Sequence, residues 1–373
     1  MKTGHLYSVS DKALFDALNN SKLTNQEIID IFFSRGILIS KETKRKDLAL
    51  YFSRLTHGYH DFEFLSEILG AYSRKEKSTS CDIPSTVKKE DLVQAAHELC
   101  KKINSEGNTA DTNILPNGDI EVVIKYQKLN LDKSELRQTI NKEATLIIEP
   151  NKTGFTLRTP LNEDVNVWKE ELLQKIQEEK DEEIEFTEIS LEHISDHKLR
   201  TEFFTELIKK IGTYDLLDVT DAYVYHPKES PSADPDFDSD GDGDGDGDEE
   251  VDFGVHISKA SLKGEGVLQS EELHSLYAKG FYIWRIIWRC KEPAVGSDQI
   301  ELEAQFAEPE SCTEFSYIAK GFYKYKNQGI YSKNRTPLSY SAEKDLLQKL
   351  ENRARETIRE ISQKATEEEN EKD

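Results

Sequence analysis

The sequence predicts an α+β fold, with a small all-α domain at the N-terminus followed by a mixed α/β body built on an antiparallel-rich sheet. Two observations predict this arrangement. Apolar residues between positions 10 and 72 recur at helical spacing, whereas strand-like runs begin only after Asp119 and have turn residues between them. With 373 residues, of which 36% are hydrophobic, the chain is long enough for about two or three domains with a buried core.

Four short helices are expected in the N-terminal domain, which we place at residues 1–75. Ser10 can cap the first helix, and Thr24 and Glu27 have the spacing of a capping box at the start of the second. The stretch 76–88 is rich in Ser and Lys, contains Pro and lacks an apolar period, so it predicts a linker.

The body is expected at residues 89–340 and mixes strand-like and helical patterns. Residues 104–118 are rich in Asn, Gly and Thr and predict a loop. Helices are expected at 90–103, 165–179 and 196–210. Strands are expected at 121–129, 144–150, 155–160, 183–191, 216–226, 251–262, 281–290, 299–306 and 315–326.

An acidic insertion interrupts the body at residues 228–250. Residues 229–252 hold twelve Asp or Glu and no Lys or Arg, in a chain of net charge −23. Alternating Gly and Asp cannot bury apolar surface and repel one another, so we expect disorder there. Strands are expected on both sides, which favours a long loop within one sheet over a boundary between domains.

The last segment, residues 341–373, predicts an amphipathic helix with a frayed tail. Apolar residues from Leu347 to Ala365 form a narrow stripe at spacings of three and four. The stripe is too short to predict a coiled coil, and packing on the body and packing on a partner helix both stay open.

A basic run stands out in the N-terminal domain. Residues 1–80 carry a net charge of +2 within an acidic chain, and Lys41, Lys44, Arg45 and Lys46 lie close together. They follow Arg35-Gly36-Ile37 and an extended stretch, and they precede a second helical pattern that ends in Phe52-Ser-Arg54-Leu55.

This segment, about residues 23–55, resembles the SAP motif, a helix–extended–helix unit associated with duplex DNA binding. The resemblance implies that Lys41, Lys44, Arg45, Lys46 and Arg54 contact DNA, the first four at phosphates where free backbone N–H groups also attract anions. The glycine that the family usually has before its second helix is absent, because Lys41-Glu42-Thr43 stands there. The alternative is a small helical bundle that docks proteins and has a solvated basic loop.

A second basic island covers residues 315–342, with five Lys or Arg, five Tyr and no acidic residue. Cations that follow phosphates and rings that stack on bases hold single-stranded nucleic acid, which makes Lys324 and Lys326 candidate contacts. On a strand these lysines would face away from Tyr323 and Tyr325. Solvated lysines over packed tyrosines are therefore the favoured alternative.

Two arginines are expected on one strand face among apolar residues. Arg285 and Arg289 need acceptors there, and Glu301 and Glu303 of the next strand can supply them. We favour structural ion pairs over a phosphate site.

A calcium-loop spacing occurs within the acidic insertion, at Asp238, Asp240, Asp242 and Glu249. No helix is expected before it, and a Gly-Asp repeat matches this spacing in several registers. We therefore expect no specific metal site.

Other patterns narrow the classes of function. No apolar run reaches the roughly 18 residues of a membrane span, and the start of the sequence lacks a signal-peptide core. The four cysteines are too far apart for a zinc knuckle and too few for a disulfide framework, which favours a cytoplasmic protein without membrane contact. None of the motifs GxxxxGK[ST], GxGxxG, GxSxG or HExxH occurs, so catalytic residues stay unknown and no cofactor is expected.

Together these patterns favour a non-enzymatic subunit of a larger assembly that binds nucleic acid, with DNA and a further protein as partners. Two alternatives stay open: a metal-dependent nuclease with its site in the body, and a pure protein–protein adaptor.

Overall fold

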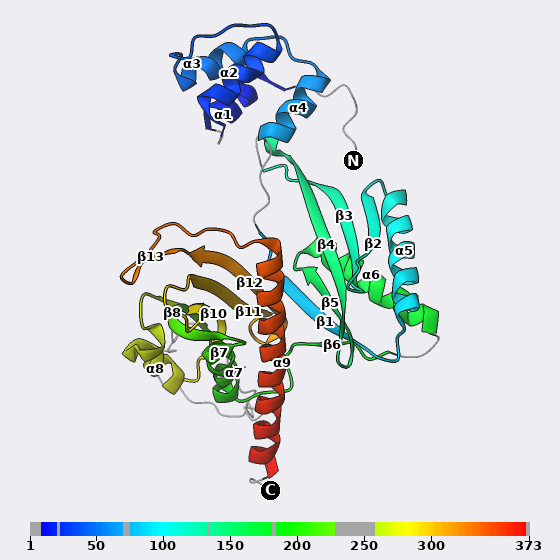
Figure 1. Ribbon diagram of the computed structural model, residues 1–373, viewed down its shortest axis with the longest axis vertical. Coiled ribbons are helices and arrows are strands. Elements are labelled where there is room, and N and C mark those ends of the chain that lie inside the picture. The colour runs from blue at the N-terminus through cyan, green and yellow to red at the C-terminus, as the bar shows by residue number, and fades with distance from the viewer. Residues whose placement is uncertain are drawn as a thin grey trace, which may run out of the picture. The chain divides into compact units, whose positions relative to one another are not determined.

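The computed structural model of the chain describes residues 9–20, 23–69, 75–132, 135–180, 184–227 and 258–370 (Figure 1). Its class is α+β, as predicted, with helices and antiparallel strands in one chain. Contacts divide the chain into two compact units. The first unit joins Met1–Glu76 with Pro84–Ile184, and the second joins Lys77–Ile83 with Glu185–Asp373.

The N-terminal part of the first unit is a bundle of four short helices, as predicted. The hydroxyl of Thr24 accepts a hydrogen bond from the backbone N–H of Glu27 (3.2 Å), and the Glu27 carboxylate accepts one from the N–H of Thr24 (2.6 Å), which confirms the capping box. Phe32 and Phe52 meet edge to face in the core, with ring centroids 5.1 Å apart. The helices are α1 (Asp11–Asn20), α2 (Asn25–Ser34), α3 (Arg45–Ser53) and α4 (Tyr59–Leu69).

The rest of the first unit is an antiparallel sheet with two helices. Its strands pair in sequence order, with Val122 opposite Leu146 where the second and third of them meet. In the second strand, Ile120–Leu129, alternate residues from Ile120 to Tyr126 are buried. The elements are α5 (Lys89–Ser105), β2 (Thr109–Ile114), β3 (Ile120–Leu129), the short helix η1 (Glu135–Arg137), β4 (Thr139–Asn151), β5 (Gly154–Pro160) and α6 (Glu163–Lys180).

The second unit is built on a sheet region whose strand order is β1, β12, β11, β10, β8, β7, with β6 beside β1 and β9 beside β8. Its strands are β1 (Ser78–Pro84), β6 (Thr187–Glu188), β7 (Lys210–Ile211), β8 (Tyr214–Tyr225), β9 (Lys259–Lys263), β10 (Tyr282–Lys291), β11 (Gln299–Glu308) and β12 (Thr313–Tyr323). A small hairpin follows, made of β13 (Tyr325–Asn327) and β14 (Ile330–Tyr331). The helices are α7 (His197–Lys209), η2 (Val267–Gln269), α8 (Glu271–Ala278) and α9 (Tyr340–Asn370).

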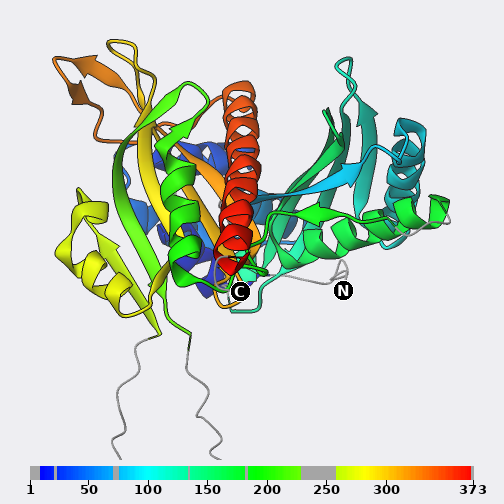
Figure 2. The same ribbon diagram turned by 90° about the horizontal axis from the view of Figure 1, so that it is seen from below.

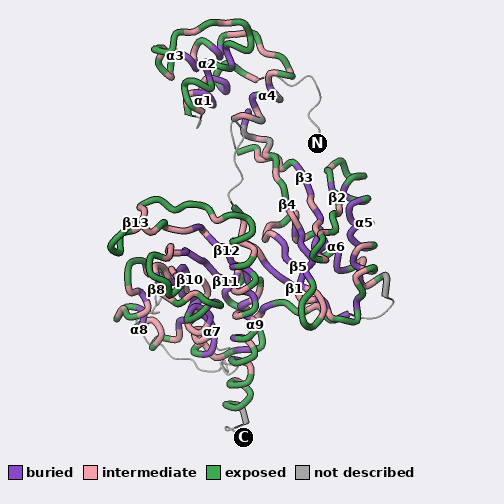
Figure 3. Tube along the Cα trace, viewed as in Figure 1, coloured by how far each residue is buried: buried purple, intermediate pink, exposed green. Residues whose placement is uncertain are grey.

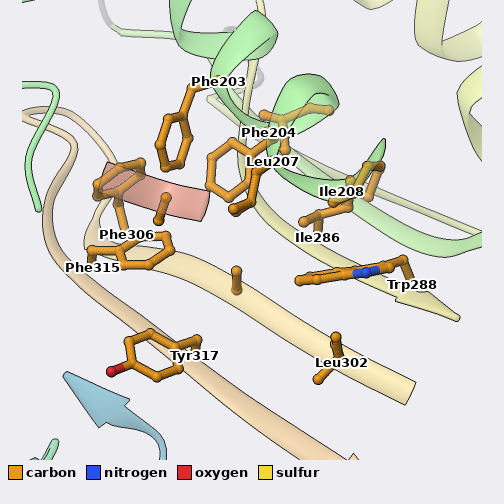
Figure 4. Close-up of a cluster of buried hydrophobic side chains, with 14 of the residues drawn as sticks. Phe203, Phe204, Leu207, Ile208, Ile286, Trp288, Leu302, Phe306, Phe315 and Tyr317 are labelled. Atoms are coloured by element: carbon orange, nitrogen blue, oxygen red, sulfur yellow. The ribbon is translucent and has the colours of Figure 1, made fainter. Parts of the chain in front are cut away.

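The core of the second unit lies between one face of this sheet and helices α7 and α9. Phe203 and Phe204 of α7 point toward the sheet, where their rings meet that of Phe306 at centroid distances of 5.5 and 5.6 Å (Figure 4). Trp288 of β10 and Tyr317 of β12 are fully buried in the same cluster. This packing fixes which face of β10, β11 and β12 points away from the helices.

Helix α9 packs on its own unit, which decides between the two alternatives left by the sequence. Its apolar stripe lies in the core, with Leu350, Ala354 and Ile361 fully buried. The helix contacts α7 and β12, and Figure 2 shows α7 and α9 side by side. The last described turns of α9 are mostly exposed (Figure 3).

Three predicted boundaries differ from the structure. The expected linker 76–88 contains strand β1, whose polar residues are buried because they have partners: the Thr79 hydroxyl donates to the carbonyl of Phe315 (2.9 Å). The expected loop 104–118 contains β2, and the expected strand 183–191 is reduced to β6. By contacts, the part of the predicted body up to residue 184 groups with the helical N-terminal part, and residues 185–340 group with the C-terminal part.

The whole of the predicted acidic insertion 228–250 lies outside the described residues, and so do the four residues of the calcium-loop pattern. Among the helices that the structure describes, none combines the length and the apolar character needed to cross a membrane.

Candidate nucleic-acid interface

The segment that resembles the SAP motif folds as helix α2, a non-helical stretch and helix α3. The basic run lies just before α3 and in its first turn, which follows from Lys44 being the N-cap residue. Lys41, Lys44, Lys46 and Arg54 are exposed, and none of the four forms an ion pair with a described acidic residue. Their charges are therefore available to an external anion.

Arg45 differs from its neighbours, because its guanidinium holds the bundle together. Its Nε donates to the carbonyl of Leu18 at 2.7 Å, and its Nη1 donates to the carbonyl of Leu23. These bonds tie the start of α3 to the end of α1 and the turn after it. Arg45 therefore has a structural role, and its assignment as a phosphate contact stays a prediction.

The same helical bundle exposes several large apolar side chains. Leu38 is 82% exposed and Phe33 is 66% exposed, and Tyr51 and Phe64 are each about half exposed. In a bundle whose core is already filled by Phe32, such side chains are typical of a surface that contacts another molecule.

Lys324 and Lys326 lie in the second unit, at the start of the β13–β14 hairpin. Both lysines are exposed, whereas Tyr325 packs on Tyr331 with ring centroids 5.5 Å apart. This is the favoured alternative from the sequence: packed tyrosines beneath solvated lysines. These two lysines and the cations around α3 belong to different units and are treated as separate candidate surfaces.

A third charged surface covers the face of the second sheet that points away from α7 and α9. We call it the ionic layer, and it contains two glutamates and five cations. Its members are Lys77, Arg285, Arg289, Glu301, Glu303, Lys320 and Arg335.

One centre of the ionic layer is Glu303, which is only 3% exposed. Its carboxylate lies 2.6 Å from Lys77 Nζ, 2.9 Å from Arg285 Nε and 3.2 Å from Lys320 Nζ. Burial by itself would raise the pKa of Glu303, but the hydrogen bond from Lys77 and the three cations outweigh it and lower the pKa.

The partner Lys77 also has a lowered pKa, mainly because its ammonium is buried, and the attraction of Glu303 only partly opposes this effect. The lowered pKa of Glu303 favours its charged carboxylate, whereas the lowered pKa of Lys77 favours its neutral amine. At neutral pH the charged carboxylate describes the cluster better, because Glu303 has three cationic neighbours, whereas Lys77 shares the Glu303 carboxylate with two other cations.

The other centre is Glu301, which is 6% exposed. It accepts a hydrogen bond from Arg335 and another from the Tyr323 hydroxyl (2.9 Å). The Nε of Arg289 lies 3.7 Å away, and Lys320 lies 3.9 Å away. Lys320 therefore bridges the two glutamates.

Aromatic rings hold the two arginines of this layer in place. The Arg285 guanidinium lies 4.4 Å from the ring centroid of Tyr223, and that of Arg289 lies 4.8 Å from the centroid of Tyr323. The Nε of each arginine forms an ion pair with a glutamate but no hydrogen bond, and its terminal nitrogens have no hydrogen-bond acceptor among the described residues. Both side chains are about one-third exposed, so donors of each guanidinium are available to an anion.

This arrangement bears on the nuclease alternative. Glu301 and Glu303 are surrounded by five cations, which oppose the binding of a further cation. In the described part of the chain, no group of three His, Cys, Asp or Glu residues is arranged to hold a metal ion.

The sequence predicted part of this site. The ion pairs of Arg285 and Arg289 with Glu303 and Glu301 are confirmed. Arg289 lies opposite Glu301 on the adjacent antiparallel strand, whereas Glu303 lies opposite Ile287 and reaches Arg285 diagonally. Lys77 was missed, because it lies 228 positions from its contact Gln305 and no local pattern links them.

No family model matches the chain, and no curated protein matches it either.

Proposed function

We propose that the protein is a non-enzymatic subunit that binds nucleic acid, and that it contacts DNA phosphates through the helical bundle of the first unit. The observation that carries this proposal is the group of exposed cations around α3, Lys41, Lys44, Lys46 and Arg54, which have no ionic partner among the described residues. Phosphate contacts of this kind supply most sequence-independent affinity for DNA.

The contrast with the rest of the chain supports the proposal. Several surface lysines of this acidic chain are paired, such as Lys102 with Glu171 and Lys128 with Glu163. In the bundle, Arg35 pairs with Asp61 (3.4 Å) and Arg45 fixes the start of α3, but the cations around α3 have no ionic partner among the described residues. A rigid helix start with free cations around it suits a phosphate backbone.

The test uses the full chain and a triple variant, Lys41→Gln, Lys44→Gln and Lys46→Gln, with Arg45 kept. The matched control, Lys12→Gln, Lys101→Gln and Lys152→Gln, removes the same charge from other exposed lysines of the first unit. Binding to a fluorescent DNA duplex is measured by anisotropy between about 50 and 200 mM salt.

Loss of three phosphate contacts should reduce the salt dependence by about 2.7 in the slope of log K against log salt. Over this range, wild-type affinity should fall roughly 40-fold more than that of the triple variant. If both triple variants lose affinity equally, binding reflects net charge only and the assignment of these lysines is wrong.

A protein–protein adaptor is the second candidate, favoured by the exposed apolar side chains of the same bundle. The variant Phe33→Ser with Leu38→Ser should then abolish co-purification of the partner while DNA binding is unchanged. Partner retention by this variant would contradict the adaptor function.

A further inference from the structure

The ionic layer on the second sheet has features of a ligand site that ion pairing alone does not explain. A buried glutamate needs one or two partners to be neutralised, yet five cations surround two glutamates. The layer therefore keeps an excess of positive charge in a chain whose net charge is −23.

Neighbouring acidic residues cancel only part of this excess. On the adjacent strand β8, Asp221 pairs with Lys263 (3.8 Å), and Asp218, which lies opposite Arg289, is one further carboxylate against an excess of three cations. The five cations are between about one-fifth and two-fifths exposed at their side chains, so they can be reached from solvent.

The two arginines are also held in fixed orientations. The Nε of Arg285 lies 2.9 Å from Glu303 and that of Arg289 lies 3.7 Å from Glu301, and each guanidinium lies against a tyrosine ring. Charge on one side and a ring on the other restrict the orientation of each guanidinium. Fixed guanidinium groups lose little entropy when they form paired hydrogen bonds to a phosphate. Arg285 and Arg289 are four residues apart on β10, which pairs with β11 in regular register. At the rise per residue of a strand, their Cα atoms are about 13 Å apart.

We propose that the ionic layer binds the phosphate backbone of single-stranded nucleic acid, with Arg285 and Arg289 as the main contacts. Glu301 and Glu303 act as positioning residues. This surface is separate from the cations around α3, so the protein has two nucleic-acid contacts of different kinds.

Two observations favour a single strand over other anions. The cations extend along β10 and across to β12 and Lys77, which suits an extended ligand with several charges better than one small phosphate. Guanidinium groups and the rings of Tyr223 and Tyr323 lie together in the same layer, and guanidinium groups and rings can both stack with unpaired bases, which a duplex does not offer.

The experiment isolates this surface from the first one. All variants are made in the full chain that already carries Lys41→Gln, Lys44→Gln and Lys46→Gln. The test variant adds Arg285→Gln and Arg289→Gln. The matched control adds Lys198→Gln and Lys210→Gln, which remove equal charge at the two ends of α7, the helix that packs on the opposite face.

The probe is a fluorescent oligothymidylate of about 20 nucleotides, a length that covers a typical single-strand site. Loss of two phosphate contacts should reduce the salt slope by about 1.4, so that the parent loses roughly sevenfold more affinity than the test variant between about 50 and 200 mM salt. The control should keep the parent slope. Equal losses in both variants, or none in the test variant, would overturn the proposal.

The test variant removes two ion pairs, which can destabilise the fold. A third variant therefore separates loss of binding from loss of folding. Arg285→Lys with Arg289→Lys retains both charges beside Glu303 and Glu301 but removes the paired donors. It should bind the oligonucleotide at least about fivefold more weakly at an unchanged melting temperature. Unchanged binding would show that charge alone suffices and that fixed guanidinium groups are not the contacts.

Competition identifies the ligand class. Unlabelled oligothymidylate should displace the probe at far lower phosphate concentration than a duplex of the same length or inorganic phosphate. If the duplex competes equally well, or if inorganic phosphate does, the assignment to single-stranded nucleic acid is wrong.

Discussion

Replacement of Glu303 by Gln should destabilise the second unit by about 3 kcal/mol. Three charged contacts to a buried carboxylate are lost, from Lys77, Arg285 and Lys320. Hydrogen bonds to charged groups contribute roughly 1.5 to 3 kcal/mol each. The three cations remain 22 to 27% exposed and regain part of their hydration, which brings the net cost to about 3 kcal/mol, at the lower end for a broken buried pair.

The effect of pH has a definite sign. The pKa of Glu303 is lowered in the folded protein, so its contribution is complete above the ordinary glutamate value of 4.5 and is lost as the pH falls below that value. The difference in unfolding free energy between the wild type and Glu303→Gln should therefore be full at about pH 7 and should shrink toward about pH 3.

Tryptophan fluorescence is the assay, because Trp284 and Trp288 lie in the second unit and Trp168 in the first. Both proteins carry Trp168→Phe, so that the signal reports on the second unit alone. At about 2 to 4 °C per kcal/mol for a unit of this size, the melting temperature should fall by about 6 to 12 °C.

The control is Glu308→Gln, an exposed glutamate of the same strand with no ion pair among the described residues, which should change stability by less than about 0.5 kcal/mol. The reasoning is refuted if Glu303→Gln matches this control, or if its deficit is the same at both pH values.

Two further predictions concern the acidic insertion and helix α9. Replacement of residues 230–249 by a short Gly-Ser loop should keep the melting temperature within a few degrees, because the N–H of His226 already bonds the carbonyl of Ser258 (2.9 Å) and halving a loop stabilises by only about 0.6 kcal/mol. Calorimetry measures the melting temperature. A large loss of stability in the loop variant, together with stabilisation of the parent by calcium, would instead support the calcium-loop pattern. Leu350→Ala should cost about 2 to 5 kcal/mol in urea unfolding, against less than about 0.5 kcal/mol for exposed Asn352→Ala. Equal stabilities would mean that the stripe of α9 is not held in the core.

The sequence predicted the elements whose stabilisation is local. Helices α5, α6, α7 and α9 follow apolar periods that are visible in the chain, and the capping box of α2 needs only Thr24 and Glu27. The pairs of Arg285 and Arg289 with the two glutamates were also within reach, because β10 and β11 are consecutive strands.

What the sequence could not predict depends on distant partners. Strand β1 has the composition of a loop, and it becomes a strand because β12 and Arg355 of α9 satisfy its polar side chains. Arg45 has the same local context as Lys44 and Lys46, and only the carbonyl groups of Leu18 and Leu23 distinguish it. Such differences arise from tertiary contacts, which no local pattern encodes.

The order of the strands along the chain also sets when each one is available for folding during synthesis. Strand β1 is synthesised early, and its neighbour β12 follows roughly 240 residues later, with Ser78 opposite Tyr317. At about 5 to 20 residues per second, the ribosome needs roughly 12 to 48 seconds to deliver that partner. Closing a loop of this length costs about 5 kcal/mol of chain entropy, apart from a constant. A cut between Ile184 and Glu185 separates β1 from β12. The fragment that starts at Glu185 lacks β1, and the fragment that ends at Ile184 has β1 without β12, so neither contains a complete second unit.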